Sequence, residues 1–573
     1  MNNAEIAALF WEISELLELS GDNPFKARAY RHAAEKIESL PEPLSTMYEE
    51  GRLGDIEGIG EALKKKLEEI ITTGRLRYYE DLNEKVPRVL VELLDIPGVG
   101  PKTARALYEH LHIGGIDELE AAAKAGRVRE LPGMGVKTEQ NILRGIQMLR
   151  GRLDRIPLGV AMPIAQDFIE SIRRIPQVLE VRAAGSLRRR KETIGDIDIV
   201  AASGDAIAVM DAIEKLPRTR EVLSRGGTRM VVMARDGIKV DTWVVGPSFF
   251  WSALHHSTGS KAHNVKLRGM AREMGLKINE YGISREDGTE ILINREEDIY
   301  SALGLDFIAP ELREDTGEIE AAREGRLPRL LEPGDIRGDL HMHSTWSDGV
   351  TSIEEMAEAA RRMGYSYIAI CDHSKSLGVA RGLAEETLRR QVKAIRELNK
   401  RLTGMRVLAG VEVDIRRDGT LDHPDELLAE LDIVVASVHS GFRQDADTMT
   451  ARIIAAMRNP HVDIIGHPTG RLLGRREPYA VNIDALIEAA AETGTVLEIN
   501  SYPDRLDLSD IHARMAKERG VKLAINTDAH SREQLGYIEY GVSVARRAWL
   551  SRDDVINAWE GERLLKFLGE HKH

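Results

Sequence analysis

Apolar residues recur at helical spacing over the first 150 residues. The N-terminal stretch MNNAEIAALFWEISELLELS places apolar residues three and four positions apart, with acidic residues between them. Similar patterns follow up to about residue 150, separated by turns that contain Gly. This part of the chain is therefore predicted to be all helical.

The pattern changes to short strands set among helices from about residue 180. The runs DIDIVAA, RMVVMA and KVDTWVV are typical of strands in a mixed α/β unit. Helical and turn patterns resume near residue 250. Residues 314–335 are charged, interrupted by Gly and Pro, and poor in strand formers, so we interpret them as a linker.

Strand-like apolar runs alternate with helical stretches beyond the linker. The runs are SYIAICDH, RVLAGVEVD, DIVVASVH, VDIIGHP, TVLEIN and KLAINTDAH. Such alternation favours a parallel barrel or sheet built from βα units. A chain of 573 residues has room for about three or four domains, which agrees with this change of pattern.

Composition narrows the class of protein. The single cysteine, Cys371, excludes an internal disulfide, and we find neither a signal peptide nor an apolar window of roughly 18 residues. We therefore expect a cytoplasmic protein without a membrane partner. The net charge of −14 hides a basic middle, because residues 101–270 hold 27 Lys and Arg against 19 Asp and Glu. That middle part is suited to face phosphates.

A weak repeat marks the helical region: DIEGIGEALKKKL, DIPGVGPKTARAL and ELPGMGVKTEQNI. Each copy predicts a Gly turn that opens a helix, where backbone N–H groups can hold a phosphate. A single copy is more often a packing turn, but three copies resemble the helix-hairpin-helix motif of DNA-binding proteins. The candidate DNA-binding residues of the three turns are Gly58, Gly60, Gly98, Gly100, Lys102, Gly133, Gly135 and Lys137.

Three carboxylates of the α/β unit are candidate Mg²⁺ ligands. Side chains alternate along a strand, so Asp196 and Asp198 should share one face while Ile197 and Ile199 enter the core. Asp241 can reach the same point from a neighbouring strand, although a solvated strand end is the simpler interpretation of the Asp pair alone. Three carboxylates suit one or two Mg²⁺ or Mn²⁺ ions that promote an in-line displacement at phosphorus.

The stretch GSLRRRKETIGDID, followed by KVD and HSTGSKAHNVKLR, resembles the family X DNA polymerases over residues 185–268. The resemblance implies catalysis by Asp196, Asp198 and Asp241, a palm and thumb architecture, and deoxynucleoside triphosphates with gapped or primer-template DNA as substrates. His256 and Ser257 replace an aromatic pair of several members, and Ile194 replaces a hydroxyl residue. The implied substrate-binding residues are Arg155, Gly185, Ser186, Arg189, Gly195, His256, Ser257, Gly259, Asn264 and Arg268.

NPFKARAYRHAAEKI and GIGEALKKKLEEI are similar to the small gap-binding domain of polymerase beta. The similarity places Lys66 at the position of a Schiff-base lysine that removes deoxyribose phosphate, with Lys26 and Tyr30 beside it. Such a lysine needs a lowered pKa, and we expect the neighbouring Lys64 and Lys65 to assist. Binding of a 5′-phosphate by a basic helix face is the alternative, and Ala62 replaces another basic position of that pocket.

The last third of the chain concentrates metal-type ligands at the ends of predicted strands. In a barrel these ends meet at one active site, so a shared metal centre is expected. Mixed imidazole and carboxylate ligands suit Mn²⁺, Zn²⁺ or Fe²⁺, and this number can hold two or three ions. The nine residues are His341, His343, Asp348, His373, Glu412, His439, His467, Asp528 and His530.

This ligand set resembles the PHP domain of polymerases and histidinol phosphatases. Together the similarities identify the chain as a member of the prokaryotic family X polymerases that carry a C-terminal PHP domain. The resemblance implies gap filling in repair, a 3′→5′ exonuclease and, in some members, cleavage at abasic sites. Arg471, Arg475 and Arg476 either guide DNA to this site or form a solvated loop. Two alternatives stay open: a PHP domain that hydrolyses small phosphates, and a scaffold that only binds DNA ends.

The expected architecture is therefore multidomain. We predict a helical gap-binding domain over 1–85, a second helical DNA-binding domain over 86–150, a nucleotidyltransferase palm over 151–245 and a thumb over 246–313. The linker over 314–335 then leads to a distorted (βα) barrel of PHP type over 336–573. We expect the chain to act as a monomer.

Overall fold

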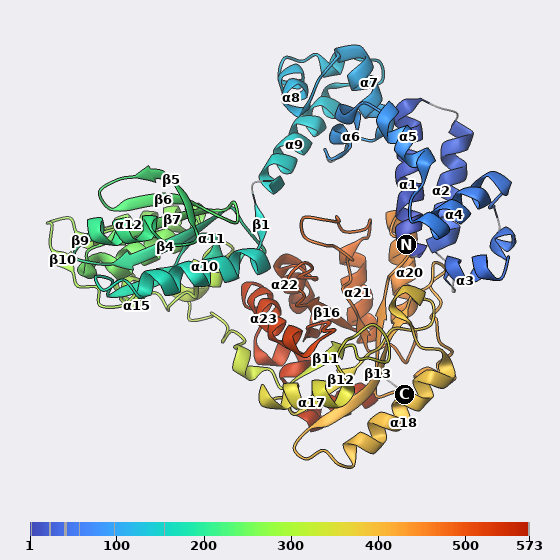
Figure 1. Cartoon of the computed structure of the whole chain (residues 1–573). Helices are drawn as coiled ribbons and strands as arrows, with labels where there is room; N and C mark the ends of the chain where they lie inside the picture. The colour runs from blue at the N-terminus through green and yellow to red at the C-terminus, as the bar shows by residue number, and fades with distance from the viewer. Residues whose placement is uncertain are drawn as a thin grey trace.

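The structure, a computed structural model, describes the chain except residues 2, 22–23, 39, 41–42, 57, 97, 154 and 571–573. For residues 4, 24, 35, 38, 147–148, 150–153 and 379 it describes the backbone alone. Figure 1 shows the N-terminal helices in blue, the green palm and thumb beside them, and the yellow-to-red C-terminal barrel below. Among the described residues, none of the helices combines the length and the apolar character that crossing a bilayer needs.

The N-terminal part is helical, as predicted. An apolar cluster runs through it from Ile6 to Leu149. The helices are α1 Asn3–Ser20, α2 Pro24–Glu38, α3 Leu44–Glu49, α4 Glu61–Thr73, α5 Arg77–Lys85, α6 Arg88–Leu94, α7 Pro101–Leu111, α8 Ile116–Lys124 and α9 Val136–Leu153.

The three Gly turns open helices α4, α7 and α9. Gly58, Gly98 and Gly133 have φ values of 82°, 87° and 77°, which side chains with a Cβ rarely adopt. Gly60 and Gly100 are the N-cap residues of α4 and α7. The turns therefore have the predicted geometry, with backbone N–H groups at the start of each helix.

A five-stranded sheet forms the palm, in the order β2-β4-β7-β6-β5. Strands β4 and β7 are parallel and the other neighbours are antiparallel. The strands are β2 Glu180–Ala183, β4 Asp196–Ala202, β5 Thr219–Arg225, β6 Arg229–Ala234 and β7 Lys239–Val245, while β1 Ile156–Pro157 pairs with β3 Thr193–Ile194. The palm helices are α10 Leu158–Arg173, α11 Gly185–Arg188 and α12 Ala206–Glu214.

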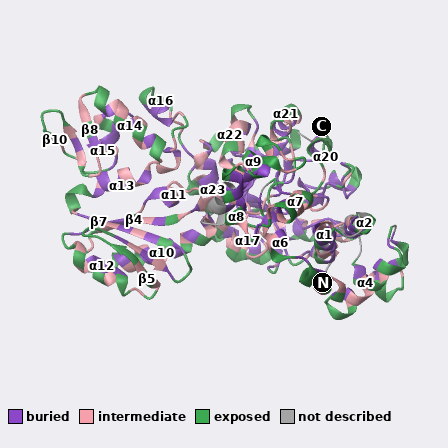
Figure 2. Ribbon diagram, turned by 90° about the horizontal axis from the view of Figure 1, so that it is seen from above, coloured by how far each residue is buried: buried purple, intermediate pink, exposed green. Residues whose placement is uncertain are grey.

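Side chains along β4 point alternately to the two faces of the sheet, so the apolar core and the carboxylates lie on different faces. Ile197 and Ile199 pack into the cluster that α10 and α12 cover, whereas Val200 packs with α13 (Phe250–Thr258) on the opposite face. Asp196 and Asp198 lie on the face of Val200, at the start of the strand. The alternation of buried and less buried positions along β4 and β7 can be followed in Figure 2.

The thumb contains a small sheet that the sequence did not predict. Helices α13, α14 (Lys261–Glu273) and α15 (Glu297–Ala302) pack with antiparallel strands β8 Leu276–Asn279, β9 Gly282–Arg285 and β10 Glu290–Ile291. These strands are at most four residues long and largely polar, too short for an alternating pattern to stand out.

The predicted linker is only partly a connection. Residues 314–335 include helix α16 (Glu318–Arg323), which places Ile319 and Ala322 in the apolar core of the thumb. Glu318 is also fully buried, within 2.6 Å of the His263 imidazole. The charged composition of this segment therefore hides an amphipathic turn of helix that belongs to the thumb.

Seven parallel strands form the C-terminal barrel, in chain order from β11 to β17. The barrel nearly closes, because Met342 at the end of β11 forms a parallel bridge with Ala529 after β17. The strands are β11 Gly338–Met342, β12 Tyr367–Ile370, β13 Arg406–Asp414, β14 Ile433–Ser437, β15 Ile464–Ile465, β16 Val496–Asn500 and β17 Leu523–Asn526. The helices are α17 Ile353–Arg362, α18 Glu385–Asn399, α19 Asp425–Leu428, α20 Ala446–Met457, α21 Ile483–Thr493, α22 Asp510–Glu518, α23 Ile538–Arg547 and α24 Gly561–Glu570.

Helix α24 packs Leu564 and Leu568 into the apolar interior of the barrel, beside Leu340, Tyr367 and Val496. Tyr367 and Val496 are the first residues of their strands. These apolar side chains therefore fill the barrel near the N-terminal ends of its strands. The C-terminal strand ends remain for polar side chains, as is usual for a barrel active site.

Candidate active sites

Three carboxylates meet near the start of the neighbouring strands β4 and β7. Asp198 on β4 lies directly opposite Asp241 on β7 in the parallel register, and Asp196 lies two residues before Asp198. Burial, together with the charges of Asp196 and Asp241, raises the pKa of Asp198 to about 7. Arg229 binds Asp241 with both Nε and Nη2, at 2.9 and 2.6 Å. Such a like-charge group fits a divalent cation, which would relieve the repulsion.

Gly185 borders this group from helix α11. Its φ of 57° lies in the left-handed region, and a Cβ built there would overlap the Asp198 carboxylate. Glycine is therefore required at this point by both backbone conformation and space. The neighbouring Ser186 lies on the same short helix.

The arginines predicted to bind phosphate lie on one side of the palm. Arg155 donates from Nε to Thr193 Oγ1 at 2.9 Å, and a Cβ on Gly195 would lie 3.2 Å from its Nη1. Arg189 donates to Glu314 at 2.9 Å and to the Thr258 carbonyl at 2.8 Å. A guanidinium has five N–H donors, and these two bonds occupy only part of them.

The thumb residues predicted to contact nucleotide and template form one chain of hydrogen bonds. The Asn264 amide donates to the His256 carbonyl at 2.8 Å, and Arg268 Nε donates to the Asn264 carbonyl at 3.2 Å. A Cβ on Gly259 would collide with the Asn264 amide. Ser257 is half-buried beside His256 on α13.

Lys66 lies over two tyrosine rings in the N-terminal part. Its Nζ is 4.0 Å from the centroid of Tyr78 and 5.4 Å from that of Tyr30. Burial and the charge of Lys26 lower the pKa of Lys66. The expected help from Lys64 and Lys65 is not the main effect, because adjacent helix positions point in different directions. Tyr30 is only 2% exposed and lies beneath the lysine. Tyr78 was missed, since nothing local in RLRYYEDL distinguishes it.

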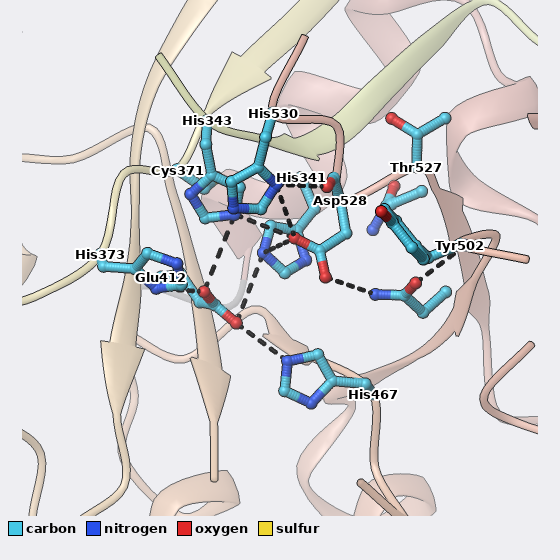
Figure 3. A network of polar contacts seen from close by, with 12 residues as sticks. His341, His343, Cys371, His373, Glu412, His467, Tyr502, Thr527, Asp528 and His530 are labelled. Atoms are coloured by element: carbon cyan, nitrogen blue, oxygen red, sulfur yellow. Dashed lines mark hydrogen bonds and ion pairs between the residues drawn. The ribbon is translucent and has the colours of Figure 1, made fainter. Parts of the chain in front are cut away.

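All nine metal-type residues of the barrel come together at the C-terminal strand ends. Figure 3 shows Glu412 between imidazoles from several strands. Its Oε2 lies 2.6 Å from His373 Nδ1, and its Oε1 lies 3.1 Å from His467 Nε2 and 3.3 Å from His439 Nε2. These three imidazoles lie close enough to share metal ions with the same carboxylate.

Three overlapping groups in the barrel have metal-ligand spacing. Within each group one ligand atom per residue lies within 4.8 Å of the others. The first is His343, Asp348, His373 and His530, the second His341, His343 and Asp528, and the third His373, Glu412 and His439. Because His343 and His373 are shared, the arrangement suits neighbouring ions.

The state of the donor atoms also fits metal binding. In the part of the chain that the structure describes, the buried His341 Nε2 makes no hydrogen bond, and the 2.6 Å contact between Glu412 Oε2 and His373 Nδ1 lacks the direction of one. The pKa of Glu412 stays well below its usual range despite burial, because His439, His373 and His341 surround it. An ionised carboxylate facing several imidazole nitrogens is a suitable donor set for Mn²⁺, Zn²⁺ or Fe²⁺.

Two buried carboxylates that the sequence did not single out orient the ligands. Glu498 Oε1 lies 2.8 Å from His341 Nδ1, and Asp414 Oδ1 lies 2.9 Å from His439 Nδ1. Each imidazole can therefore direct Nε2 toward a metal. The sequence did contain a signal for Glu498. A carboxylate inside the apolar strand TVLEIN needs a buried partner, which points to a role inside the barrel.

A cavity of about 960 Å³ opens beside His439 and Asp414. Asn3 and Ala8 of helix α1 border its other side. Arg443 ties the two parts together, because it binds Glu15 at 2.9 Å and lies 4.2 Å from the centre of the Trp11 ring. The N-terminal helices thus form one wall of the entrance to the barrel site.

The three loop arginines have different surroundings. Arg471 binds Glu192 of the palm at 2.7 Å and is largely buried. Arg475 is exposed and lies 3.3 Å from Asp504, while Arg476 stacks on Phe442. Arg471 thus connects two units instead of belonging to a solvated loop.

Family models match four parts of the chain. A Helix-hairpin-helix domain matches residues 1–76 and a SAM-like Helix-hairpin-helix tandem matches 90–148. The DNA polymerase beta thumb matches 253–314 and the PHP domain matches 339–502. A protein of Bacillus subtilis (strain 168), the DNA polymerase/3'-5' exonuclease PolX, is 42% identical over 97% of this chain and 98% of its own length. The chain belongs to the family X DNA polymerases with a C-terminal PHP domain.

Two other relatives each match one part of this family X chain. A probable phosphatase of Thermoanaerobacter sp. (strain X514) is 34% identical over 41% of this chain and 95% of its own length. DNA polymerase lambda of Rattus norvegicus is 26% identical over 54% of this chain and 56% of its own length. The match with the probable phosphatase thus covers nearly all of that protein but less than half of this chain.

Proposed function

We propose that this family X polymerase fills short gaps in DNA during repair and shortens DNA 3′ ends with its PHP domain. The observation that carries the proposal is the presence of two separate and complete groups of metal-type ligands in one chain. Three carboxylates meet on the palm sheet, and nine imidazole and carboxylate residues meet at the barrel mouth. Metal ions bound by such groups can promote both nucleotidyl transfer and phosphodiester hydrolysis, so each group suits one of the two reactions.

In the palm, Asp196, Asp198 and Asp241 would hold Mg²⁺ or Mn²⁺. When bound, such ions promote attack by a 3′-hydroxyl and stabilise the departing pyrophosphate. Gly185 leaves room beside Asp198, and Ser186 with Arg155 lies where phosphate oxygens would arrive. Asn264 and Arg268, fixed to one another on α14, would contact the nucleotide and the template strand.

In the PHP domain, the nine ligands would hold two or three Mn²⁺, Zn²⁺ or Fe²⁺ ions. Such ions lower the pKa of water and neutralise a phosphodiester during hydrolysis. Glu412 lies among His373, His439 and His467 and would connect neighbouring ions. Glu498 and Asp414 would keep two of the imidazoles correctly turned.

The proposed substrates are gapped or primer-template DNA and deoxynucleoside triphosphates, bound by a monomer in the cytoplasm. The Gly turns before α4, α7 and α9 point N–H groups at the helix starts, where phosphates of the DNA backbone would bind. We also propose the division into gap-binding, hairpin, palm, thumb and PHP domains, with α16 added to the thumb.

A 5′-labelled primer in a one-nucleotide-gapped duplex tests this proposal. With Mn²⁺ alone the primer should shorten, and with deoxynucleoside triphosphates it should grow by one nucleotide. Changing Asp196 and Asp198 to Ala should abolish growth and leave shortening intact, whereas His341→Ala should do the reverse. Synthesis that survives the double change would refute the palm assignment, and a chain that only binds ends would show neither activity.

Hydrolysis of small phosphates is a second candidate for the PHP domain. A relative named as a probable phosphatase matches 41% of this chain over 95% of its own length, a stretch about as long as the predicted PHP domain. Comparing single-stranded DNA with a phosphate monoester such as p-nitrophenyl phosphate, on the wild type and on His341→Ala, separates the two. Turnover of the monoester alone would reassign the domain.

We further propose that Lys66 removes a 5′-deoxyribose phosphate through a Schiff base. Its lowered pKa and its position over the ring of Tyr78 support this role. A neutral amine is the form that attacks a carbonyl. If Lys66 only binds the 5′-phosphate, no covalent adduct will form.

A further inference from the structure

The PHP domain lies against the side of the palm where phosphate is expected to bind. A cavity of about 560 Å³ separates the two units. Arg155, Ser186 and Arg189 line it from the palm, while Asp510, Arg514 and Arg547 line it from helices α22 and α23. Liquid water occupies about 30 Å³ per molecule, so the cavity has room for a diphosphate group and its hydration.

Direct contacts hold the PHP side of the cavity against helix α11 of the palm. Arg547 donates from Nη1 to the Arg189 carbonyl at 2.9 Å and to Glu314 at 3.1 Å, and from Nε to Asp510 at 2.8 Å. A second contact joins Arg471 to Glu192 at 2.7 Å. The segment between α11 and β3 is thus held by the PHP domain at both ends.

Positive charge in the cavity exceeds what its carboxylates neutralise. Each carboxylate of the lining is already bound to arginine: Glu192 to Arg471, Glu311 to Arg546, Glu314 to Arg189 and Arg547, and Asp510 to Arg547. By contrast, Arg155 and Arg190 have no carboxylate within 4 Å in the part of the chain that the structure describes. An anion with several charges is the ligand that such a lining favours.

Arg514 contributes charge from the PHP side. Its Nε binds Glu518 at 3.0 Å and its Nη1 donates to the Thr316 carbonyl at 3.2 Å, while its guanidinium lies 4.2 Å from the centre of the Trp549 ring. These contacts extend the side chain from α22 toward the residues just before α16. The guanidinium therefore has a fixed position at the cavity wall, which limits the entropy lost on binding an anion.

We propose that this cavity is a diphosphate site shared by the palm and the PHP domain. It receives the β- and γ-phosphates of the incoming nucleotide and then the released pyrophosphate, with Arg190 and Arg514 as contacts additional to Ser186, Arg155 and Arg189. The inference rests on the proposed polymerase function. The PHP domain is accordingly part of the nucleotide site as well as a separate hydrolase.

Pyrophosphate titration into the full-length protein without DNA tests the site, with calorimetry as the readout. Wild type should bind, and Arg514→Gln and Arg190→Gln should each weaken binding about tenfold. Arg514→Lys, which keeps the charge, should restore most of the affinity. Arg519→Gln is the matched control, because Arg519 ends the same helix but binds Asp484 at the surface. Absence of binding by the wild type, or equal binding by Arg514→Gln, would overturn the proposal.

Steady-state kinetics on gapped DNA provide the second readout. Arg514→Gln should raise the KM for the deoxynucleoside triphosphate about tenfold with little change in kcat, because it removes binding that the substrate and transition state share. Shortening of a labelled single strand should be unchanged, which shows that the PHP domain is folded. An unchanged KM would refute the shared site. A wild type that incorporates no nucleotide would instead refute the polymerase function, whatever the titration shows.

Discussion

Glu498 and His341 form a buried pair at the floor of the barrel site, with Oε1 2.8 Å from Nδ1. The other oxygen, Oε2, accepts the backbone N–H of His467 at 2.7 Å. Asn500 extends the network, because its amide donates to Glu498 at 3.1 Å and to Asp528 at 3.1 Å. Glu498 is thus connected to His341 on β11, to His467 after β15 and, through Asn500, to Asp528 after β17.

We therefore predict that Glu498→Ala weakens metal binding in the PHP domain. Loss of a carboxylate that orients a ligating histidine typically costs about 10–100-fold in affinity. Calorimetric titration of the metal-free protein with Mn²⁺ would measure the change, and Glu498→Gln should lose less because it still offers one acceptor. Nucleotide incorporation at the palm should be unaffected. The exposed Glu492 on α21 supplies a control, Glu492→Ala, and equal losses in both variants would contradict the prediction.

A second prediction concerns Gly185 beside the palm carboxylates. Gly185→Ala should reduce nucleotide incorporation about 100-fold, since the new Cβ meets the Asp198 carboxylate in a backbone conformation unfavourable to alanine. Gly204→Ala is the matched control, because a Cβ there meets nothing within 4 Å. Single-turnover incorporation on a gapped duplex measures the effect, and shortening by the PHP domain should persist. Near-normal incorporation by Gly185→Ala would show that the site tolerates a displaced Asp198.

The separate parts of this fold were predictable to different degrees. Strand alternation was sufficient to place Asp196 and Asp198 on one face, and the position of residues such as His467 at a strand end was sufficient to collect the barrel ligands. Local pattern does not identify partners that are distant in the sequence. The contact of Arg547 with Glu314 spans 233 residues, and no periodicity encodes it.

The electrostatic surroundings of a residue were the second feature that the sequence did not predict correctly. Sequence proximity suggested Lys64 and Lys65 as the groups that perturb Lys66, whereas folding brings Lys26 of helix α2 to it. The thumb shows the same limit, because α16 looked like a charged linker until Ile319 was seen in the core. In both cases the outcome depends on which side chains folding buries or brings together. Composition, which averages over a segment, does not show this.

A third prediction follows from the lowered pKa of Lys66. Burial and Lys26 disfavour the protonated amine, so the neutral nucleophile should be present at lower pH than for an ordinary lysine with a pKa of 10.5. Borohydride trapping on a 5′-deoxyribose phosphate, measured against pH, should show this shift. Lys26→Ala removes one positive charge and should move the trapping profile to higher pH. Lys64→Ala is the control and should leave the midpoint in place, while Lys66→Ala should give no adduct.

A fourth prediction concerns the buried charges that join the thumb to the palm. Glu296 binds Arg188 of helix α11 at 2.6 Å and also the fully buried Arg313. These arginines outweigh burial and lower the pKa of Glu296 from 4.5 to about 2. Because the folded-state pKa is depressed, the stabilisation is complete above pH 4.5 and is lost as the pH falls toward 2. The shift corresponds to about 3 kcal/mol of stability.

Glu296→Gln should therefore destabilise the thumb at neutral pH, because it leaves two arginines without their carboxylate. The expected cost is roughly 3 kcal/mol, as for other broken buried pairs. Hydrogen exchange of the backbone amides of α13 to α15 should accelerate about 100-fold, while the PHP strands keep their protection. Glu286→Gln, at an exposed position of the same unit, should change nothing. Wild-type exchange in α13 to α15 that stays flat between pH 5 and pH 3, after correction for the intrinsic rate, would show that Glu296 does not hold the thumb in place.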